Sequence, residues 1–450
     1  MKKLLLAVPL VAGASWAGAS WYSGTQTQSA YDQLLTQLNE LKPFTLVNES
    51  YGGGLTRSHA VTQVLDSASA DAKVLFRLQH EIDHSPVGVD GGAVRVGAAT
   101  IRTTLLRDGS LPEVLVEFLS GFTEAEPFVV DTQVGFDGHI DNHLQVSPYR
   151  FLENGTSVDF GGVDYSVSVS GDAVSGSGIL GAFEWARAGN ALHLSPGKIR
   201  TELTRISQSV YSGSHGVDFD TLSIRAEDDM NLQATLGSIG FHGDTTVDGD
   251  LLSSQSRMSV GRIDSLLPIN AFSLETAVTK LSIEGIEHYV DTISQVSLTD
   301  AMFSDDEEIT RRILDAYAPM IGPGTGVDVA LGFSNDGGDA SLAYGISMID
   351  ETAAAYPVNG LASIVTLRDL LNAVTLEAHL DADVAAIDQT PLGMFMMSPQ
   401  AQQIIVADGV SYKSDMTLSE LIVDINGKPL ALEMMLGDKL DTPLAEMADL

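Results

Sequence analysis

Two histidines near residue 80 have the spacing of a zinc protease motif. Residues His80 to His84 run His-Glu-Ile-Asp-His, which matches H-E-x-x-H, where both histidines bind zinc and the glutamate is the general base. That chemistry requires a helix, which places residues i and i+4 on one face. Here apolar and polar residues alternate from Val74 to Asp83, which predicts a strand. On a strand the two Cα atoms would lie about 13 Å apart, so we do not expect a metalloprotease.

A second polar cluster follows about sixty residues later. His139 and His143 are interspersed with Asp137 and Asp141, and imidazole and carboxylate groups both bind divalent metals. The same segment also contains glycine and asparagine, which are typical of turns between strands. We interpret the cluster as a hairpin turn and assign no metal-binding residue to it.

The segment Gly176–Gly181 has the G-x-G-x-x-G spacing of a dinucleotide-binding loop. Such a loop needs a parallel strand before it and a long helix after it. The preceding residues alternate in polarity, and Gly189 would cut short any helix that follows. The chain also lacks a G-x-S-x-G nucleophile elbow, and it contains no cysteine, which excludes disulfides, thiolate zinc sites and cysteine nucleophiles. We therefore expect no enzyme, no cofactor, and no catalytic or metal-binding residue.

Two methionine-rich segments, Met394–Met397 and Met434-Met435, have two interpretations. Methionine side chains adapt to varied apolar partners, so these segments could line a lipid or peptide groove. They could equally fill the core against a sheet, which is the interpretation we favour because apolar side chains are usually buried.

Alternation with a period of two dominates residues 45 to 285 and predicts successive antiparallel hairpins. Turn sequences such as Asn154-Gly155 separate the alternating segments. Further on, Ser304 and Glu307 form a capping box that opens a helix, short helices are expected at Leu367–Leu371 and Met394–Val406, and a last hairpin turns at Asn426-Gly427.

We therefore expect a mainly β, β-rich α+β fold. Its long curled antiparallel sheet would be built of successive hairpins, with an N-terminal anchor helix and several C-terminal helices. The expected divisions are a signal anchor or signal peptide at 1–24, an amphipathic helix or linker at 25–43, an antiparallel β body at 44–300, and an α+β region at 301–450 packed on the sheet.

The N-terminus carries the signal for export. Lys2 and Lys3 precede Leu4–Trp21, which contains no charged residue. Ala17–Ala19 fits the small-x-small pattern of a cleavage site. Alternatively, the segment approaches the roughly 20 apolar residues that span a bilayer, and Trp21 with its aromatic neighbours would form an interfacial belt. We favour the uncleaved anchor, and both interpretations export the remaining chain.

The charge balance restricts the partners. Acidic residues number 60 against 24 basic ones, which gives a net charge of −36. A surface this negative repels nucleic acid and anionic lipid head groups, so we expect no nucleic-acid partner. An acidic, solubilising surface is favoured over an acidic patch for one basic partner. Hydrophobic residues make up 44% of the chain, which is enough for a large core.

Turn residues read in order resemble those of the YdgA-like family of uncharacterised proteobacterial envelope proteins. The matching segments extend along almost the whole chain: Trp21–Gly24, Tyr51–Leu55 with Ser58, His84–Pro86, Gly135–Gly138, Val158–Gly162, Ile283–Gly285 and Asn426-Gly427. One departure is Ser85, where the family tends to have glycine. The resemblance implies an inner-membrane anchor and periplasmic exposure, and it implies no reaction.

These observations lead to three hypotheses. In the first, the chain is a non-enzymatic envelope protein, on the periplasmic side of the bacterial inner membrane or periplasmic if the N-terminal segment is cleaved. Its sheet would bind an apolar ligand, lipid or peptide, in a groove. The second is a self-associating envelope scaffold without a small ligand, and the third is a hydrolase with an unrecognised site. The expected partners are the inner membrane through the N-terminal segment, a lipid or protein, and further copies of the chain.

Overall fold

The computed structural model describes most of the chain beyond residue 43. The described residues are 44–53, 57–66, 74–83, 87–90, 93–109, 111, 113–227, 232–265, 269–294, 315–349, 364–388, 390, 392–396, 398 and 401–444. The expected anchor at 1–24, the amphipathic segment at 25–43, the capping box at Ser304 and the segment His84–Pro86 lie outside them. Within the described part, no helix has the length and apolar character needed to cross a membrane.

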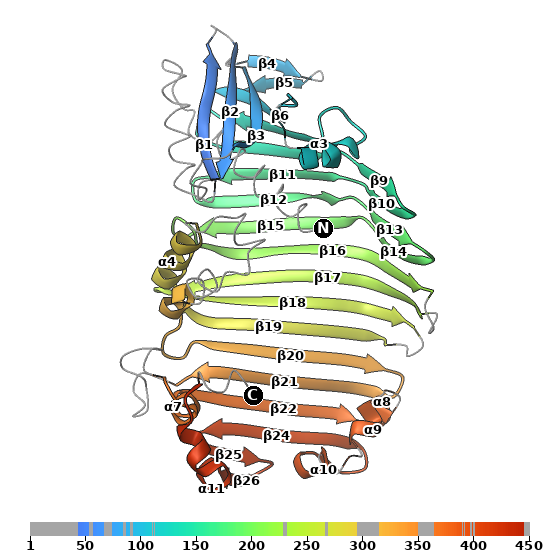
Figure 1. The fold of residues 1–450 in the computed structure, drawn as a ribbon, viewed down its shortest axis with the longest axis vertical. Helices are drawn as coiled ribbons and strands as arrows, with labels where there is room; N and C mark the ends of the chain where they lie inside the picture. Colours follow the sequence, from blue (N-terminus) through green and yellow to red (C-terminus); the bar gives the residue numbers. More distant parts are fainter. Residues whose placement is uncertain are drawn as a thin grey trace. The chain divides into compact units, whose positions relative to one another are not determined.

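The chain divides into two compact units. The first comprises residues 1–217 and 290–313, and the second comprises 218–289 and 314–450. The elements are mostly antiparallel strands, so the predicted mainly β class is confirmed. The two units are described separately below (Figure 1).

Strands β1 to β15 form most of the first unit, and their sheet order is β1-β2-β3-β6-β7-β8-β11-β12-β15. Their bounds are β1 Phe44–Gly52, β2 Arg57–Asp66, β3 Val74–Asp83, β4 Val87–Asp90, β5 Ala93–Val96, β6 Ala99–Leu105, β7 Phe128–Val134, β8 Ile140–Val146, β9 Tyr149–Glu153, β10 Thr156–Phe160, β11 Val163–Ser170, β12 Ala173–Leu180, β13 Phe183–Arg187, β14 Asn190–Leu194 and β15 Gly197–Arg205. Strand β16, Tyr211–Ala226, continues across the unit boundary.

The core of the first unit forms where helix α3, Glu113–Ser120, lies on the sheet. Phe118 and Leu119 lie in the last turn of α3, and Phe122 follows the helix and forms an antiparallel bridge with Tyr149. The rings of Phe118 and Phe122 both lie near Tyr149, at centroid distances of 5.4 and 5.1 Å. This cluster packs against Val130 and its neighbours on the sheet.

A buried polar chain crosses three strands of the same unit. His80 on β3 lies between Thr62 on β2 and Thr103 on β6, and all three are buried. Its Nε2 is 2.8 Å from the Thr62 hydroxyl and its Nδ1 is 2.9 Å from the Thr103 hydroxyl. Burial lowers the pKa of the imidazole from 6.5 to about 4, so the ring is neutral near neutral pH and one nitrogen donates while the other accepts.

The described part of the second unit contains, after the end of β16, strands β17 to β22 and β24 to β26 in consecutive antiparallel order, together with short β23 beside β24. Their bounds are β17 Leu232–Asp248, β18 Leu251–Asp264, β19 Ala271–Ser282, β20 Gly326–Asn335, β21 Gly338–Met348, β22 Val374–Asp383, β23 Val406–Ala407, β24 Ser411–Ser419, β25 Ile422–Ile425 and β26 Lys428–Ala431. Figure 1 shows them side by side in an uncurled sheet, so the predicted curl is wrong for this unit.

Turn chemistry explains the last hairpin. Asn426 and Gly427 connect β25 to β26 with φ values of 54° and 78°, the left-handed conformation that a type I′ turn requires at both positions. The predicted turn is confirmed. The predicted short helix after Thr366 is also confirmed as α7, Leu367–Ala373, whose capping box is formed by Thr366 and Asp369.

Short helices lie at the ends of these strands. They are α4 Ile283–Ser294, which crosses the unit boundary, the 3-10 turn η2 Ala318–Met320, α8 Val384–Asp388, α9 Leu392–Met396, α10 Ala401–Ile404, α11 Leu432–Leu436 and the 3-10 turn η4 Gly437–Asp441. The single helix predicted at Met394–Val406 is instead the two short helices α9 and α10. Ile387 of α8 and Met396 of α9 are buried against Ala340, Ala382 and Tyr412 of the sheet.

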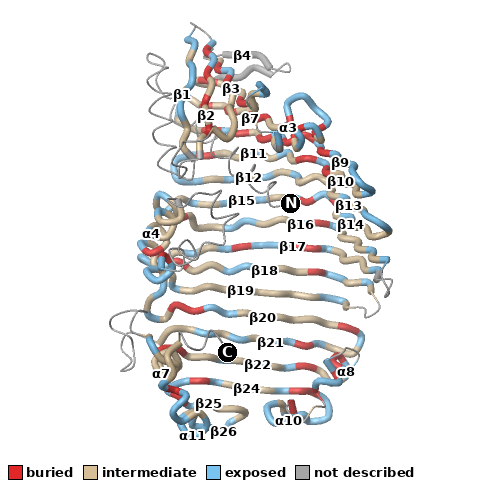
Figure 2. The backbone as a smooth tube through the Cα atoms, in the orientation of Figure 1, coloured by how far each residue is buried: buried red, intermediate tan, exposed pale blue. Residues whose placement is uncertain are grey.

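Most residues in the middle of the strands are half-buried (Figure 2). Ile239 is buried in the middle of β17, but from β20 to β24 the fully buried side chains are concentrated near the strand ends, as with Ala340, Ala382 and Leu418. Side chains between these ends therefore remain accessible to a ligand.

Protonation of His80 should make stability depend on pH. The unfolded chain binds this proton near pH 6.5, whereas the folded chain does so only near pH 4. The free energy of unfolding should therefore fall as pH falls through this window, by about 2 kcal/mol between about pH 7.5 and about pH 5. Urea unfolding of wild type and His80→Gln at both pH values measures this, and the variant should lack that part of the pH dependence. The exposed His59→Gln on β2 is the control, and equal pH slopes for His80→Gln and wild type would contradict the assignment.

Truncation of Ile387 should loosen α8 from the sheet. Its side chain is almost completely buried, so Ile387→Ala should lower the free energy of unfolding by about 3 kcal/mol, and Ile387→Val by about 1 kcal/mol. Denaturant unfolding followed by circular dichroism measures both. Leu392→Ala on the exposed side of α9 is the matched control and should change stability by less than about 0.5 kcal/mol. An Ile387→Ala effect no larger than this control would show that α8 is not packed as described.

Candidate functional site

Strand pairing sorts the side chains of the second unit onto two faces. Residues directly opposite one another in neighbouring strands share a face, and successive residues of one strand alternate between faces. Leu342 of β21 is opposite Leu331 of β20 and Leu380 of β22, whereas its neighbour Ala343 is opposite Ala330 and His379. The register therefore defines one predominantly apolar face and one polar face.

The first surface, here called the apolar face, carries no charged side chain at the paired positions of β20, β21, β22 and β24, and it ends on β18 at the exposed ion pair of Arg262 and Asp264. In the described strands, hydroxyl groups enter it at Ser254, Ser256, Thr276, Tyr344, Tyr412 and Ser414. Its residues, in strand order, are Ser254, Ser256, Met258, Val260, Phe272, Leu274, Thr276, Val278, Val327, Val329, Leu331, Phe333, Ala340, Leu342, Tyr344, Ile346, Leu376, Ala378, Leu380, Ala382, Tyr412, Ser414, Met416 and Leu418.

The middle of the apolar face is open. Val327, Leu342, Tyr344 and Ile346 are 41%, 41%, 48% and 43% exposed, although they occupy two adjacent central strands. We call these four residues the apolar band. Large apolar side chains that are adjacent and exposed are characteristic of binding surfaces, so this band is the first candidate site.

The opposite surface, here called the polar face, carries paired charges and small residues. Arg257 lies 3.0 Å from Glu275, and His242 lies 3.0 Å from Asp218. Further along the sheet, His379 forms a hydrogen bond with Asp415. These exposed pairs contribute little stability individually, and they keep this face soluble.

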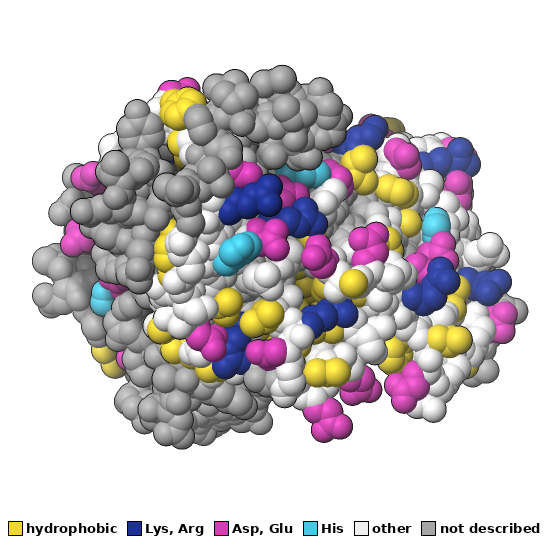
Figure 3. All heavy atoms as spheres, turned by 90° about the horizontal axis from the view of Figure 1, so that it is seen from above, with side chains coloured by type: hydrophobic (Ala, Val, Ile, Leu, Met, Phe, Trp, Pro, Cys, Tyr) yellow, Lys and Arg dark blue, Asp and Glu magenta, His cyan; other side chains and the backbone are white. Residues whose placement is uncertain are grey.

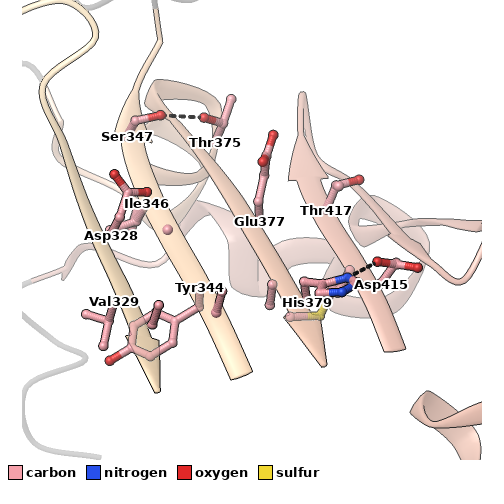
Figure 4. A pocket seen from close by; sticks show the side chains of 15 residues that line it. Asp328, Val329, Tyr344, Ile346, Ser347, Thr375, Glu377, His379, Asp415 and Thr417 are labelled. Carbon is pink, nitrogen blue, oxygen red and sulfur yellow. Dashed lines mark hydrogen bonds and ion pairs between the residues drawn. The ribbon is translucent and has the colours of Figure 1, made fainter. Parts of the chain in front are cut away.

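Glycine, alanine and serine leave two hollows in the polar face. The larger, about 560 Å³, extends over β20, β21, β22 and β24 (Figure 4). Ala330, Ala343 and Gly345 line it with little or no side chain, while Asp328 and Glu377 contribute carboxylates. The second hollow, about 460 Å³, extends over β17 to β21 and includes Ser259, Ser273 and Gly332.

The larger hollow could hold a polar or cationic group, because its side chains offer carboxylate and hydroxyl acceptors. Ser347 and Thr375 are already hydrogen-bonded to one another at 2.8 Å, and His379 is paired with Asp415 (Figure 4). Nowhere in the described ranges do three or more histidine or acidic side chains meet in a set that could hold a metal. The hollow therefore offers carboxylate and hydroxyl acceptors for weak polar contacts.

His80 to Asp83 of the H-E-x-x-H sequence lie on strand β3, as the alternation predicted, and His84 lies outside the described residues. His80 points into the buried polar chain, where both ring nitrogens bond to threonine hydroxyls. Glu81 occupies the other face, opposite His59 and Arg102 in the register. The imidazole of His80 is therefore already engaged on both sides, and the glutamate cannot act beside it.

The second histidine cluster is divided between different partners. The ring of His139 lies 3.0 Å from Asp141, whereas the ring of His143 lies 3.0 Å from Asp164 on β11. Gly138 has a φ of 83° and lies in the predicted turn, but Asn142, the asparagine also expected in the turn, is buried inside strand β8. The structure does not bring the two imidazoles onto one common ligand group.

The glycines of the dinucleotide-like sequence accommodate a tyrosine. A Cβ atom on Gly176 would lie 2.3 Å from the hydroxyl of Tyr165, and one on Gly178 would meet the same residue's Cα at 2.7 Å. The Tyr165 ring crosses this glycine pair on β12 and its hydroxyl donates to Thr201 at 2.9 Å. These two glycines are needed for close side-chain packing inside an antiparallel sheet.

The methionine-rich segments were only partly interpreted correctly. Met396 is buried, as a core residue should be, but Met394, Met434 and Met435 are strongly exposed. The core interpretation is therefore wrong for these three. Met397 lies outside the described residues. Sequence periodicity could not distinguish buried Met396 from exposed Met394, because α9 is only five residues long.

Charges of both signs are interleaved in the first unit as well. Arg102 is 2.9 Å from Glu126 and 3.1 Å from Asp131, and the acidic partners raise the pKa of its guanidinium. In Figure 3 lysine and arginine side chains lie beside acidic ones across the surface in view. On that surface the basic residues do not gather into a separate patch.

Comparison with known proteins gives a family but no activity. Residues 1–433 match the family described as "Bacterial protein of unknown function (DUF945)". Protein YdgA of Escherichia coli (strain K12) is similar at 22% identity over 204 residues, which is 39% of this chain and 39% of that protein. No solved structure matches. The resemblance to a YdgA-like family is confirmed, and the chain belongs to the DUF945 family of bacterial proteins of unknown function.

Proposed function

We propose that this chain is a non-enzymatic envelope protein that binds lipid acyl chains on the apolar face of its second unit. The observation that carries the proposal is the apolar band, four large side chains left 41–48% exposed on two adjacent strands. Covering such a surface releases roughly 25 cal/mol for each Å² of apolar area removed from water. A soluble sheet that retains this surface gains most from a hydrocarbon partner.

Backbone pairing favours an acyl chain over a peptide. Strand β20 pairs with β19 and β21, and β21 pairs with β20 and β22. Their main-chain groups are therefore used within the sheet and cannot hydrogen-bond an added peptide strand. A peptide laid on this face would bury polar groups without partners, which is costly. Hydrocarbon carries no such groups.

The helices limit the band at one end without covering its middle. Helices α8 and α9 bury the end of the apolar face through Ile387 and Met396. Beyond them, Leu331, Leu376 and Leu380 are half-buried and border the exposed residues of β21. The result is an uncharged strip across several strands, whose length can be matched by an extended acyl chain.

The proposal includes a location at the bacterial inner membrane. A charge-free segment at Leu4–Trp21 follows two lysines, which supports anchoring in the bacterial inner membrane with the body on the periplasmic side. A lipid-binding protein there would have its ligand in the adjacent bilayer. Neither nucleic acid nor a cofactor enters this proposal.

Self-association through the same band is the alternative. Two copies could cover their apolar faces with one another, which would make the protein a scaffold without a small ligand. The net charge of −36 opposes this arrangement because two such chains repel one another. Lipid binding requires no approach of a second acidic chain.

Polar substitutions within the band should abolish lipid contact. The full chain in membranes would be given a phospholipid that carries a photoactivatable group on its acyl chain, and cross-linked peptides would be mapped by mass spectrometry. Wild type should cross-link on β20 and β21, and Leu342→Asn with Ile346→Asn should reduce this about tenfold, which corresponds to about 1.4 kcal/mol.

The matched control places the same substitutions on the other face of the same strand. Ser341→Asn with Ser347→Asn alters the polar face and should leave cross-linking unchanged. Urea unfolding of both double variants checks that each remains folded. Equal cross-linking in the two double variants would refute the lipid site, and a native mass of two or more chains without lipid would favour the scaffold.

A further inference from the structure

The lobe that contains α8, α9 and α10 displays exposed apolar side chains beside the apolar face. Met394 and Val410 are 80% and 74% exposed. With them we define the apolar tip as the exposed large apolar residues of this lobe: Leu392, Met394, Phe395, Ile404, Val406 and Val410. Residues that are usually buried are therefore concentrated here at the surface.

Hydrogen bonds hold these residues in one lobe. The amide of Val384 at the start of α8 donates to the carbonyl of Val410 at 2.9 Å. The hydroxyl of Ser414 on β24 donates to the carbonyl of Ile404 at 2.7 Å. Buried Gly393 lies close against Asp388 and Ile387, and Met396 inserts between the helices and the sheet. The exposed side chains are thus presented from an anchored structure.

The part of the lobe between Asp388 and Asp408 also lacks charge, in contrast with the remainder of the chain. No charged residue occurs between Asp388 and Asp408, although 19% of the whole chain is charged. The polar side chains in this interval are uncharged glutamines, serine and threonine. An uncharged, largely apolar stretch like this is unfavourable as a solvated surface and as a contact for a charged partner. It is compatible with the interfacial region of an uncharged bilayer.

We propose that the apolar tip inserts into the surface of a bilayer of zwitterionic lipids. The inference deepens the proposed function, on which it rests, because it identifies where lipid would reach the apolar face. Met396, Leu380 and Tyr412 belong to one packed cluster, so apolar contacts continue from the lobe onto the sheet. A lipid chain leaving the bilayer at the tip would meet hydrocarbon surface rather than charge.

A bilayer is a better occupant than a second copy for two reasons. The charge-free segment at Leu4–Trp21 is expected to tether the chain to a membrane, which raises the effective concentration of bilayer at the tip. A second copy would bring another 36 negative charges to the same place. Zwitterionic head groups impose neither this repulsion nor that of anionic lipids.

The chain contains no cysteine, so single labels can be placed without removing native residues. Full-length Met394→Cys carrying an environment-sensitive nitrobenzoxadiazole label would be reconstituted in vesicles of phosphatidylcholine and phosphatidylethanolamine. Bromine atoms on the acyl chains should quench this label about twofold. The same label at Thr417→Cys, an exposed position on the polar face, should not be quenched. Equal quenching at both positions, or none at either, would overturn the proposal.

A second variant tests the tip residues themselves. Phe395→Asp with Leu392→Asp, labelled at Val410→Cys, should lose the quenching seen with Val410→Cys alone, while vesicle flotation through the N-terminal segment is retained. A fluorescence change at position 394 that occurs without lipid and increases with protein concentration would instead identify a second copy as the occupant.

The two proposals can fail separately. Acyl cross-links on β20 and β21 with an unquenched label at position 394 would overturn the tip and leave the lipid site standing. Quenching at position 394 without those cross-links would support the tip as a membrane contact and refute the lipid site.

Discussion

Antiparallel pairing between successive strands determines which residues of the second unit share a surface. Each strand from β18 to β22 is hydrogen-bonded on both sides, so the backbone has no pairing capacity left and side chains alone meet a ligand. Because side chains alternate, the register that pairs Leu342 with Leu380 also pairs Ala343 with His379. An apolar face and a polar face are therefore two consequences of one hydrogen-bonding pattern.

The two faces are suited to different environments. On the polar face, small residues such as Gly345 and Ala343 leave hollows, and the surrounding charges are already paired. Among the described residues, the helices that pack on the apolar face lie near the strand ends, where Ile387 and Met396 are buried. Tyr344 in between remains 48% exposed. A sheet that served only as a scaffold would gain stability from covering this strip, so the open strip favours a surface kept accessible for an apolar ligand.

Local patterns in the sequence were sufficient to predict strands and turns, but they could not predict which side chains contact one another across the fold. The strand at Val74–Asp83 and the Asn426-Gly427 turn follow from alternation and from left-handed turn preference, which are properties of neighbouring residues. The hydrogen bonds of His80 depend on β2 and β6, eighteen and twenty-three residues away. No local period specifies such a register, and for the same reason the sequence could not show that Tyr344 shares a face with Val329. Exposure of Met394 likewise depends on how a five-residue helix is anchored.

The charge distribution connects the two proposals about the second unit. A net charge of −36 makes most of the surface unfavourable for anionic membranes, so any lipid contact must occur where charge is missing. The interval between Asp388 and Asp408 and the apolar face are two such places, and the packed cluster around Met396 joins them. Hydrocarbon that moves along this path never needs to cross a charged side chain, and avoiding that crossing spares several kcal/mol of desolvation. In this proposal, the acidic remainder would act as the boundary that confines lipid to one route.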